Sequence, residues 1–226
     1  MQLFIGNKNY SSWSMRPWVL LREFEIPFEE VLVRFDSFDA SSSFKKRIGT
    51  VSGAGKVPVL VDGSLVVWDT LAIAEYLAEK CPALALWPRD SALRARARSV
   101  CAEMHSGFGA LRSHFGMNIE ASLPEVGARV LAAEPAVAAD LARIAALWRD
   151  ALATSGGPFL FGDYSIADAY FAPVVMRIRT YALPVAAPLA AYAERVVASA
   201  GVAAWMRDAL AEQDFLAFEE PYRTRR

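Results

Sequence analysis

Cysteine and histidine are scarce in this chain, which has two of each among its 226 residues. The two cysteines, Cys81 and Cys101, form no CxxC motif. Such sparse cysteine is typical of a protein that keeps its thiols reduced, so we expect free thiols rather than a disulfide framework. We therefore predict a cytoplasmic protein without a metal site.

A strong charge imbalance and long apolar runs are also absent. The formal net charge is -1, which gives no reason to expect nucleic acid or an anionic membrane as a partner. No apolar run approaches the ~20 residues that span a bilayer, and the beginning of the chain does not resemble a secretory signal. Hydrophobic residues make up 54% and charged residues 22% of the chain, as is usual for a folded protein with a core.

The first strand signal, at Leu3–Ile5, precedes a helix signal. Apolar residues at helical spacing follow from Trp18. With Ser14 as N-cap, Pro17 falls in the first turn, where a helix tolerates proline. A second strand is predicted over Phe28–Val33. The intervening helix predicts that the two strands are parallel and joined by a right-handed crossover.

A hairpin signal comes next. The apolar runs 58–61 and 65–68 flank Asp62-Gly63, a dipeptide typical of hairpin turns. Asp69 is predicted to cap the following helix. With a short helix before the hairpin, the predicted order is β-α-β-(α)-β-β-α. We assign residues 1–81 to this α/β domain.

The rest of the chain shows no convincing strand signal. Residues 82–90 are predicted to be a linker, and residues 91–226 an all-helical domain. Ser165-Ile166-Ala167-Asp168 has the S-x-x-D form of a capping box, with a structural role expected for Asp168. The helices are predicted over residues 91–115, 123–154, 166–181, 188–199 and 202–212.

Four motifs, in order along the chain, resemble those of cytosolic glutathione transferases. The first, Ser11 to Arg16, resembles the S-S-C-S-W-R stretch of the zeta class. Gly55 to Leu60 resembles the family's K-V-P-x-L segment, whose proline is cis. Residues 68–77 resemble its E/Q-S-x-A-I-x-x-Y-L segment, and residues 165–168 resemble its S-x-A-D capping box. The resemblance implies a thioredoxin-like N-terminal domain and an all-helical C-terminal domain.

The resemblance assigns catalysis to Ser11, whose hydroxyl is expected to donate a hydrogen bond to the sulfur of glutathione. The nearby start of a helix also favours negative charge. Ser12 remains an alternative for this role. Trp13 replaces the zeta-class cysteine and is expected to wall the site. From the residues alone, the serines could equally serve as caps and turn formers.

Further residues are expected to hold glutathione. Asp69 can receive its amine and Thr70 its γ-glutamyl carboxylate, although both could simply cap a helix. Val57, extended before Pro58, can offer its peptide groups to the cysteinyl part as an added strand would. The glycyl carboxylate is expected against a basic side chain from the set Lys45, Lys46, Arg47 and Lys56.

A second substrate, a small hydrophobic electrophile, is expected between the domains. Side chains at helical spacing on the first long helix of the second domain are candidates for its site, although such a stripe could also be core. These candidates are Met104, His105, Phe108, Leu111, Arg112 and Phe115.

The resemblance implies a homodimeric detoxification enzyme that uses glutathione as co-substrate and no metal. One alternative is a zeta-type cis-trans isomerase of maleylacetoacetate. Such isomerases carry an arginine where this chain has Thr180, although Arg177 and Arg179 lie nearby. Another alternative is a binding or regulatory module that has lost catalysis.

Overall fold

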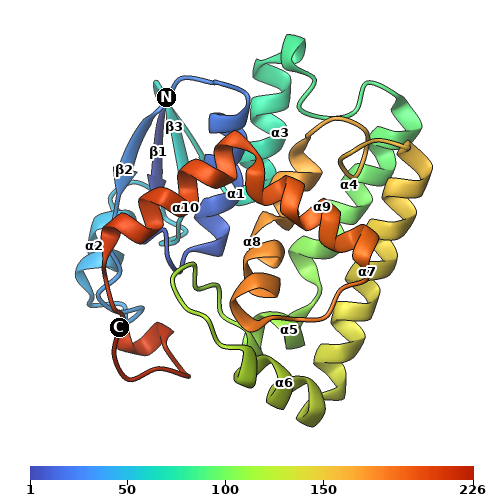
Figure 1. Ribbon diagram of the computed structural model, residues 1–226. Coiled ribbons are helices and arrows are strands. Elements are labelled where there is room, and N and C mark those ends of the chain that lie inside the picture. The colour runs from blue at the N-terminus through green and yellow to red at the C-terminus, as the bar shows by residue number, and fades with distance from the viewer.

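The computed structural model describes residues 1–226, with a four-stranded sheet in the first part of the chain and helices in the second (Figure 1). The strands are β1 (Gln2–Ile5), β2 (Glu29–Leu32), β3 (Val59–Asp62) and β4 (Leu65–Trp68). Their order in the sheet is β2-β1-β3-β4. The pair β1–β2 is parallel and the other two pairs are antiparallel, which confirms the predicted crossover and hairpin.

Helices α1 (Ser12–Glu23) and α3 (Thr70–Lys80) cover one face of this sheet, and α2 (Ser43–Gly49) covers the other. The alternation of side chains along β1 separates two cores. Leu3 and Ile5 belong to the large core shared with α1, α3 and the helical domain. Phe4 lies in a smaller cluster with side chains of α2. The helical domain therefore rests on the α1–α3 face.

Helix α1 begins earlier than the sequence pattern predicts. Ser11 is its N-cap and Pro17 lies inside the helix, so the prediction of Ser14 as N-cap is wrong. The physical reason is that the Ser14 hydroxyl accepts hydrogen bonds from the Gly6 N–H at 3.1 Å and from Ser11 Oγ at 2.8 Å. Ser14 thus connects the helix to the end of β1 and leaves no side-chain cap at the helix start.

The helical domain contains seven α-helices, and two predicted helices are each divided. The first division follows Ser106, where Phe108 has a φ of 56°. The second precedes Pro135, because proline lacks an N–H and disfavours helical geometry at the residue before it. The helices are α4 (Ser91–Ser106), α5 (Gly109–His114), α6 (Pro124–Ala133), α7 (Pro135–Ser155), α8 (Ile166–Tyr181), α9 (Ala187–Ala198) and α10 (Ala200–Glu212).

The predicted capping box is confirmed at the start of α8. Asp168 is fully buried, and its carboxylate accepts hydrogen bonds from the N–H groups of Leu160 and Ser165 and from the Tyr192 hydroxyl. Burial raises the pKa of Asp168 to about 6, although these hydrogen bonds favour its charged form. One side chain thereby joins the start of α8 to the preceding loop and to α9.

Helix α10 attaches the end of the helical domain to the sheet domain and crosses in front of it in Figure 1. Its anchor is Lys8, whose Nζ lies 2.8 Å from carboxylate oxygens of both Glu30 and Asp208. The Trp205 indole donates to the Lys8 carbonyl at 3.0 Å. A Cβ on Gly201 would lie 2.3 Å from the Val19 carbonyl oxygen, so the close approach of α10 to α1 requires glycine there. The two domains are thus fixed around the space between them.

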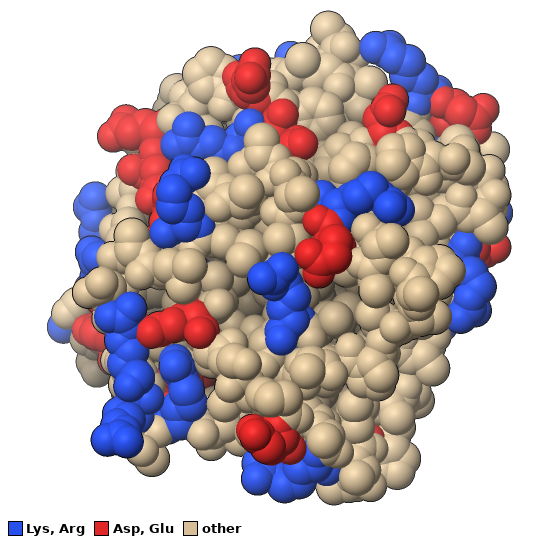
Figure 2. All heavy atoms as spheres, in the orientation of Figure 1, with Lys and Arg blue, Asp and Glu red and all other residues tan.

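The surface carries both signs of charge. Figure 2 shows Lys and Arg interspersed with Asp and Glu over the displayed face. None of the helices combines the length and the apolar character that a membrane crossing requires.

Candidate functional site

The serine loop lies where β1 leads into α1. Ser11 is 7% exposed, and its hydroxyl donates to Ser14 Oγ at 2.8 Å. Ser12 is more exposed, and its hydroxyl makes no hydrogen bond within the protein. The hydroxyls therefore differ in environment: Ser11 belongs to a hydrogen-bonded pair at the helix start, whereas Ser12 is free.

Two adjoining cavities meet beside this loop. The α3 cavity, of 530 Å³, is lined by Trp13, Lys56, Val57, Pro58, Asp69 and Thr70, together with Ala54, Trp68 and His105. The serine cavity, of 490 Å³, is lined among others by Ser11, Ser12, Trp13, Lys45, Lys56 and Val57. Because Trp13, Lys56 and Val57 line both cavities, one elongated ligand can occupy both.

Asp69 presents an accessible carboxylate in the α3 cavity. One oxygen accepts from the Leu71 N–H at 2.9 Å, and the other lies 3.4 Å from His105 Nε2. The backbone of Asp69 has a φ of 76°, a strained conformation for a residue other than glycine, and such strain is frequent at functional sites. Thr70, the first residue of α3, is 2% exposed and lies on the same wall. The arrangement combines an anion with the positive end of a helix.

His105 lies on the wall of the α3 cavity, beside Asp69. Its Nδ1 is 3.2 Å from the Tyr170 hydroxyl, and its ring lies against Trp13. The end of α4 therefore contacts the start of α3. We assign His105 to the surroundings of Asp69.

Val57 lies on the wall shared by the two cavities. The Val57–Pro58 peptide bond is cis, in agreement with the resemblance. Neither the N–H nor the carbonyl of Val57 makes a backbone hydrogen bond. An extended ligand can therefore pair with this residue as a strand would.

The predicted basic residues separate into two groups. Lys45 Nζ donates to the Gly55 carbonyl at 2.8 Å and lies on the wall of the serine cavity, and Lys56 lies between both cavities without an ion-pair partner. Lys46 and Arg47 are exposed on α2 and line neither cavity. Only Lys45 and Lys56 are placed to meet a ligand.

Two arginines add positive charge to the serine cavity. Arg177 is 4% exposed and donates to the carbonyls of Phe115 and Pro173. Burial lowers its pKa to about 9, which still leaves it charged at neutral pH. The guanidinium of Arg112 lies 5.6 Å from the centre of a Trp13 ring, and its buried Nε has no hydrogen-bond partner. A buried donor without a partner favours an anionic or polar ligand.

Four of the predicted second-substrate residues belong to the hydrophobic core: Met104, Phe108, Phe115 and Leu111. Met104 and Phe115 are fully buried, Phe108 is 6% exposed, and none of them lines either cavity. The reason is that α4 packs against α8 and α5 packs against α7, so these side chains point into the helical domain and not into the space between the domains. We therefore omit all four from the proposed site.

Other lining residues had no signal in the sequence. They come from the loop after β2, the loop after α5 and the C-terminal segment, and only folding brings them together. They include Phe35, Phe38, Met117 and Glu219. Within the protein, no group of three or more histidine, cysteine or acidic residues could hold a metal, and both cysteines are free.

Comparison with known proteins adds independent evidence. Residues 10–80 match the model of the glutathione S-transferase N-terminal domain, and residues 94–208 match that of the C-terminal domain. The chain is 33% identical over 102 residues to a probable maleylacetoacetate isomerase of Caenorhabditis elegans, a match that covers 45% of each chain. It is 47% identical over 64 residues to glutathione S-transferase Z1 of Arabidopsis thaliana, which covers 28% of this chain and 26% of that relative.

A solved structure extends the similarity over the full fold. A glutathione transferase homologue from Burkholderia, determined with bound glutathione, is 27% identical and superposes with a TM-score of 0.64. The match covers 93% of this chain and 98% of that one. The two domain matches and this superposition agree with the order of motifs along the chain. This chain belongs to the glutathione S-transferase family.

Proposed function

We propose that this protein binds glutathione across the two cavities and stabilises its thiolate for attack on an electrophile. The observation that carries the proposal is the placement of three receivers in adjoining cavities: the Asp69 carboxylate, the unpaired peptide groups of Val57 and the Ser11 hydroxyl. They match the amine, the peptide and the thiol of the tripeptide in order. The bound glutathione in the Burkholderia homologue supports the same ligand.

The thiolate would gain from both the serine and the helix. A free thiol has a pKa near 8.5, so only a few per cent is ionised at neutral pH. The Ser11–Ser14 pair is suited to stabilising the anion, because a hydroxyl can rotate. Donation from Ser14 to Ser11 would release the Ser11 proton for the sulfur. The positive end of α1 would add a favourable charge interaction.

We expect Asp69→Asn to weaken glutathione binding roughly tenfold to a hundredfold. A hydrogen bond to a charged group contributes about 1.5–3 kcal/mol, and the substitution removes the charge that the amine meets. Asparagine keeps an oxygen that can cap α3, so the fold should be retained. Titration calorimetry measures the change in Kd.

The matched control is Asp90→Asn, which changes the exposed cap of α4 outside both cavities. It should leave Kd unchanged. Equal affinities of Asp69→Asn and the unsubstituted protein would exclude Asp69 as the receiver of the amine.

The charge of the serine cavity favours a second candidate function, isomerisation of an unsaturated carboxylate. Four basic side chains and one carboxyl group line this cavity: Lys45, Lys56, Arg112, Arg177 and Glu219. Such a wall suits a substrate anion better than a purely hydrophobic electrophile. The thiolate would add to a cis alkene and leave again after rotation, as the similarity to a maleylacetoacetate isomerase suggests.

Arg112→Met tests this second candidate. We expect KM for maleylacetone, an anionic cis-alkene substrate, to rise roughly tenfold to a hundredfold, because the partner of the carboxylate is lost. The rate with an uncharged aryl chloride should stay nearly constant. A parallel change with both substrates would show that Arg112 does not recognise the anion.

The cellular setting completes the proposal. We propose a cytoplasmic homodimer that acts in detoxification, and light scattering tests the dimer. The alternative, a binding module without catalysis, predicts retention on immobilised glutathione without turnover of any electrophile.

A further inference from the structure

The C-terminal segment, residues 213–226, leaves α10 and turns back toward the serine loop, and its last residue, Arg226, pairs with Glu120 in the loop after α5. The Tyr10 hydroxyl donates to Glu220 Oε1 at 2.8 Å and accepts from the Leu216 N–H at 3.3 Å. Tyr10 directly precedes Ser11. The end of the chain is therefore attached to the loop that carries the proposed catalytic hydroxyl.

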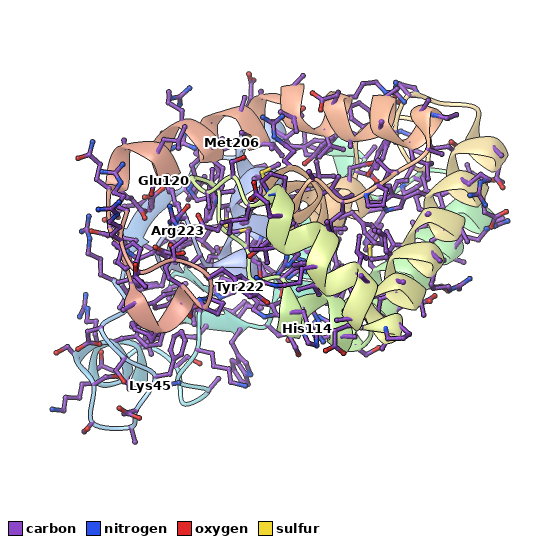
Figure 3. All side chains as sticks on the ribbon, turned by 60° about the horizontal axis from the view of Figure 1, so that its bottom comes forward. Lys45, His114, Glu120, Met206, Tyr222 and Arg223 are labelled. Atoms are coloured by element: carbon purple, nitrogen blue, oxygen red, sulfur yellow. The ribbon has the colours of Figure 1, made fainter.

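Glu220 is the anchor of this segment. It is 5% exposed and also accepts from Asn118 Nδ2 at 2.8 Å and from the Arg223 guanidinium. The Tyr222 hydroxyl donates to the His114 carbonyl at 2.8 Å, and Figure 3 shows Tyr222 and Arg223 projecting from the segment toward the body of the molecule. These bonds hold the segment at a defined place.

Glu219, next to the anchor, has a different environment. It is the only carboxyl group among the 15 residues that line the serine cavity, and its side chain makes no hydrogen bond or ion pair. Burial and the neighbouring Glu220 carboxylate raise the pKa of Glu219 to about 7. A carboxylic acid that is half protonated near neutral pH is suited to proton transfer.

The serine cavity is small enough for its walls to share one ligand. A volume of 490 Å³ is that of a single small-molecule site, so a ligand that fills it meets both Ser11 and Glu219. Glu220 is the charged group that acts on Glu219 directly, and the other titratable groups that line the serine cavity are Tyr10, Lys45, Lys56, Arg112 and Arg177. The basic side chains of this cavity can hold a developing enolate oxygen. Among the groups that line the cavity, Glu219 is the acid suited to protonate carbon at neutral pH.

Resting on the proposed function, we propose that Glu219 is the general acid for conjugate addition of glutathione to an α,β-unsaturated carbonyl compound. The sulfur–carbon bond forms and the π electrons of the alkene move into an enolate. The O–H bond of Glu219 then breaks as a C–H bond forms at the α-carbon. Water restores the proton to the carboxylate, which balances the proton released when the thiol ionised.

The test compares two electrophiles with Glu219→Gln in the full chain. Benzylidene acetone needs a proton on carbon after addition, whereas chlorodinitrobenzene loses chloride and needs none. We expect kcat for benzylidene acetone to fall roughly 10²-fold, a typical general-acid contribution, and kcat for chlorodinitrobenzene to remain unchanged. With the unsubstituted protein, the rate of addition to benzylidene acetone should fall above about pH 7, because the Glu219 carboxyl group loses its proton. This fall should disappear in Glu219→Gln. Glu219→Asp should recover part of the rate.

The matched control is Glu125→Gln, an exposed position at the start of α6. It should change neither reaction. An equal loss with both electrophiles, no loss with either, or no addition to benzylidene acetone by the unsubstituted protein would overturn the role of Glu219. Failure of the unsubstituted protein to bind glutathione would instead overturn the proposed function, so calorimetry accompanies the assay.

Discussion

Ser11→Ala should raise the pKa of the glutathione thiol in the complex by up to about two units, equivalent to at most about 2.7 kcal/mol of lost preference for the anion. The reason is that alanine removes the hydroxyl donor while the positive end of α1 remains. Near neutral pH, kcat/KM for an aryl chloride should then fall by up to about 20-fold, because less of the bound thiol is ionised. The absorbance of the bound thiolate, followed against pH, measures the shift directly.

The pH dependence of the rate gives the prediction a second check. Because Ser11→Ala leaves the glutathione contacts in place, its rate should recover as pH rises through the new thiol pKa. Ser12→Ala is the matched control, because Ser12 lines the same cavity and its hydroxyl has no internal partner. A normal profile for Ser11→Ala together with a shifted profile for Ser12→Ala would assign the hydroxyl donor to Ser12.

Asp168→Ala should produce the largest loss of stability, about 3–5 kcal/mol. The substitution leaves the buried N–H groups of Leu160 and Ser165 and the Tyr192 hydroxyl without their acceptor. For a chain of this size, we expect Tm to fall by roughly 10 °C. Calorimetric unfolding measures both quantities where the transition is reversible.

Asp168→Asn should have an intermediate effect, because one acceptor oxygen remains. Asp90→Ala, which removes an exposed helix cap, should cost only about 1 kcal/mol. The fraction of Asp168→Ala that remains folded should bind glutathione with nearly normal affinity, since Asp168 lies outside both cavities. Comparable losses from Asp90→Ala and Asp168→Ala would contradict the structural role of the buried carboxylate.

The successful predictions of the fold rest on local signals. Asp62-Gly63 predicts a hairpin because its geometry is local, and Gly63 indeed has a φ of 61°. The S-x-x-D sequence predicts the start of α8 for the same reason. The prediction of Ser14 as N-cap is wrong because its hydroxyl is hydrogen-bonded to Gly6 and Ser11, a tertiary contact that sequence spacing cannot show.

In the candidate site too, residues within local motifs were predicted and residues brought in by tertiary folding were not. Ser11, Val57 and Asp69 lie within motifs, so their proximity follows from a resemblance to a known fold. Arg177 and Glu219 reach the serine cavity from distant parts of the chain without a local signal. The apolar spacing of Met104, Phe108 and Phe115 predicts one helical face, but the helix is divided at Phe108, and all three side chains lie in the core of the helical domain.

We expect one glutathione molecule to occupy the space from the start of α3 to the start of α1. Titration calorimetry of the unsubstituted protein with reduced glutathione tests it most directly. We expect saturable binding with one tripeptide per chain, weakened by Asp69→Asn. The absence of any detectable heat of binding at millimolar glutathione would contradict this expectation, provided that a second buffer with a different ionisation enthalpy also reveals none.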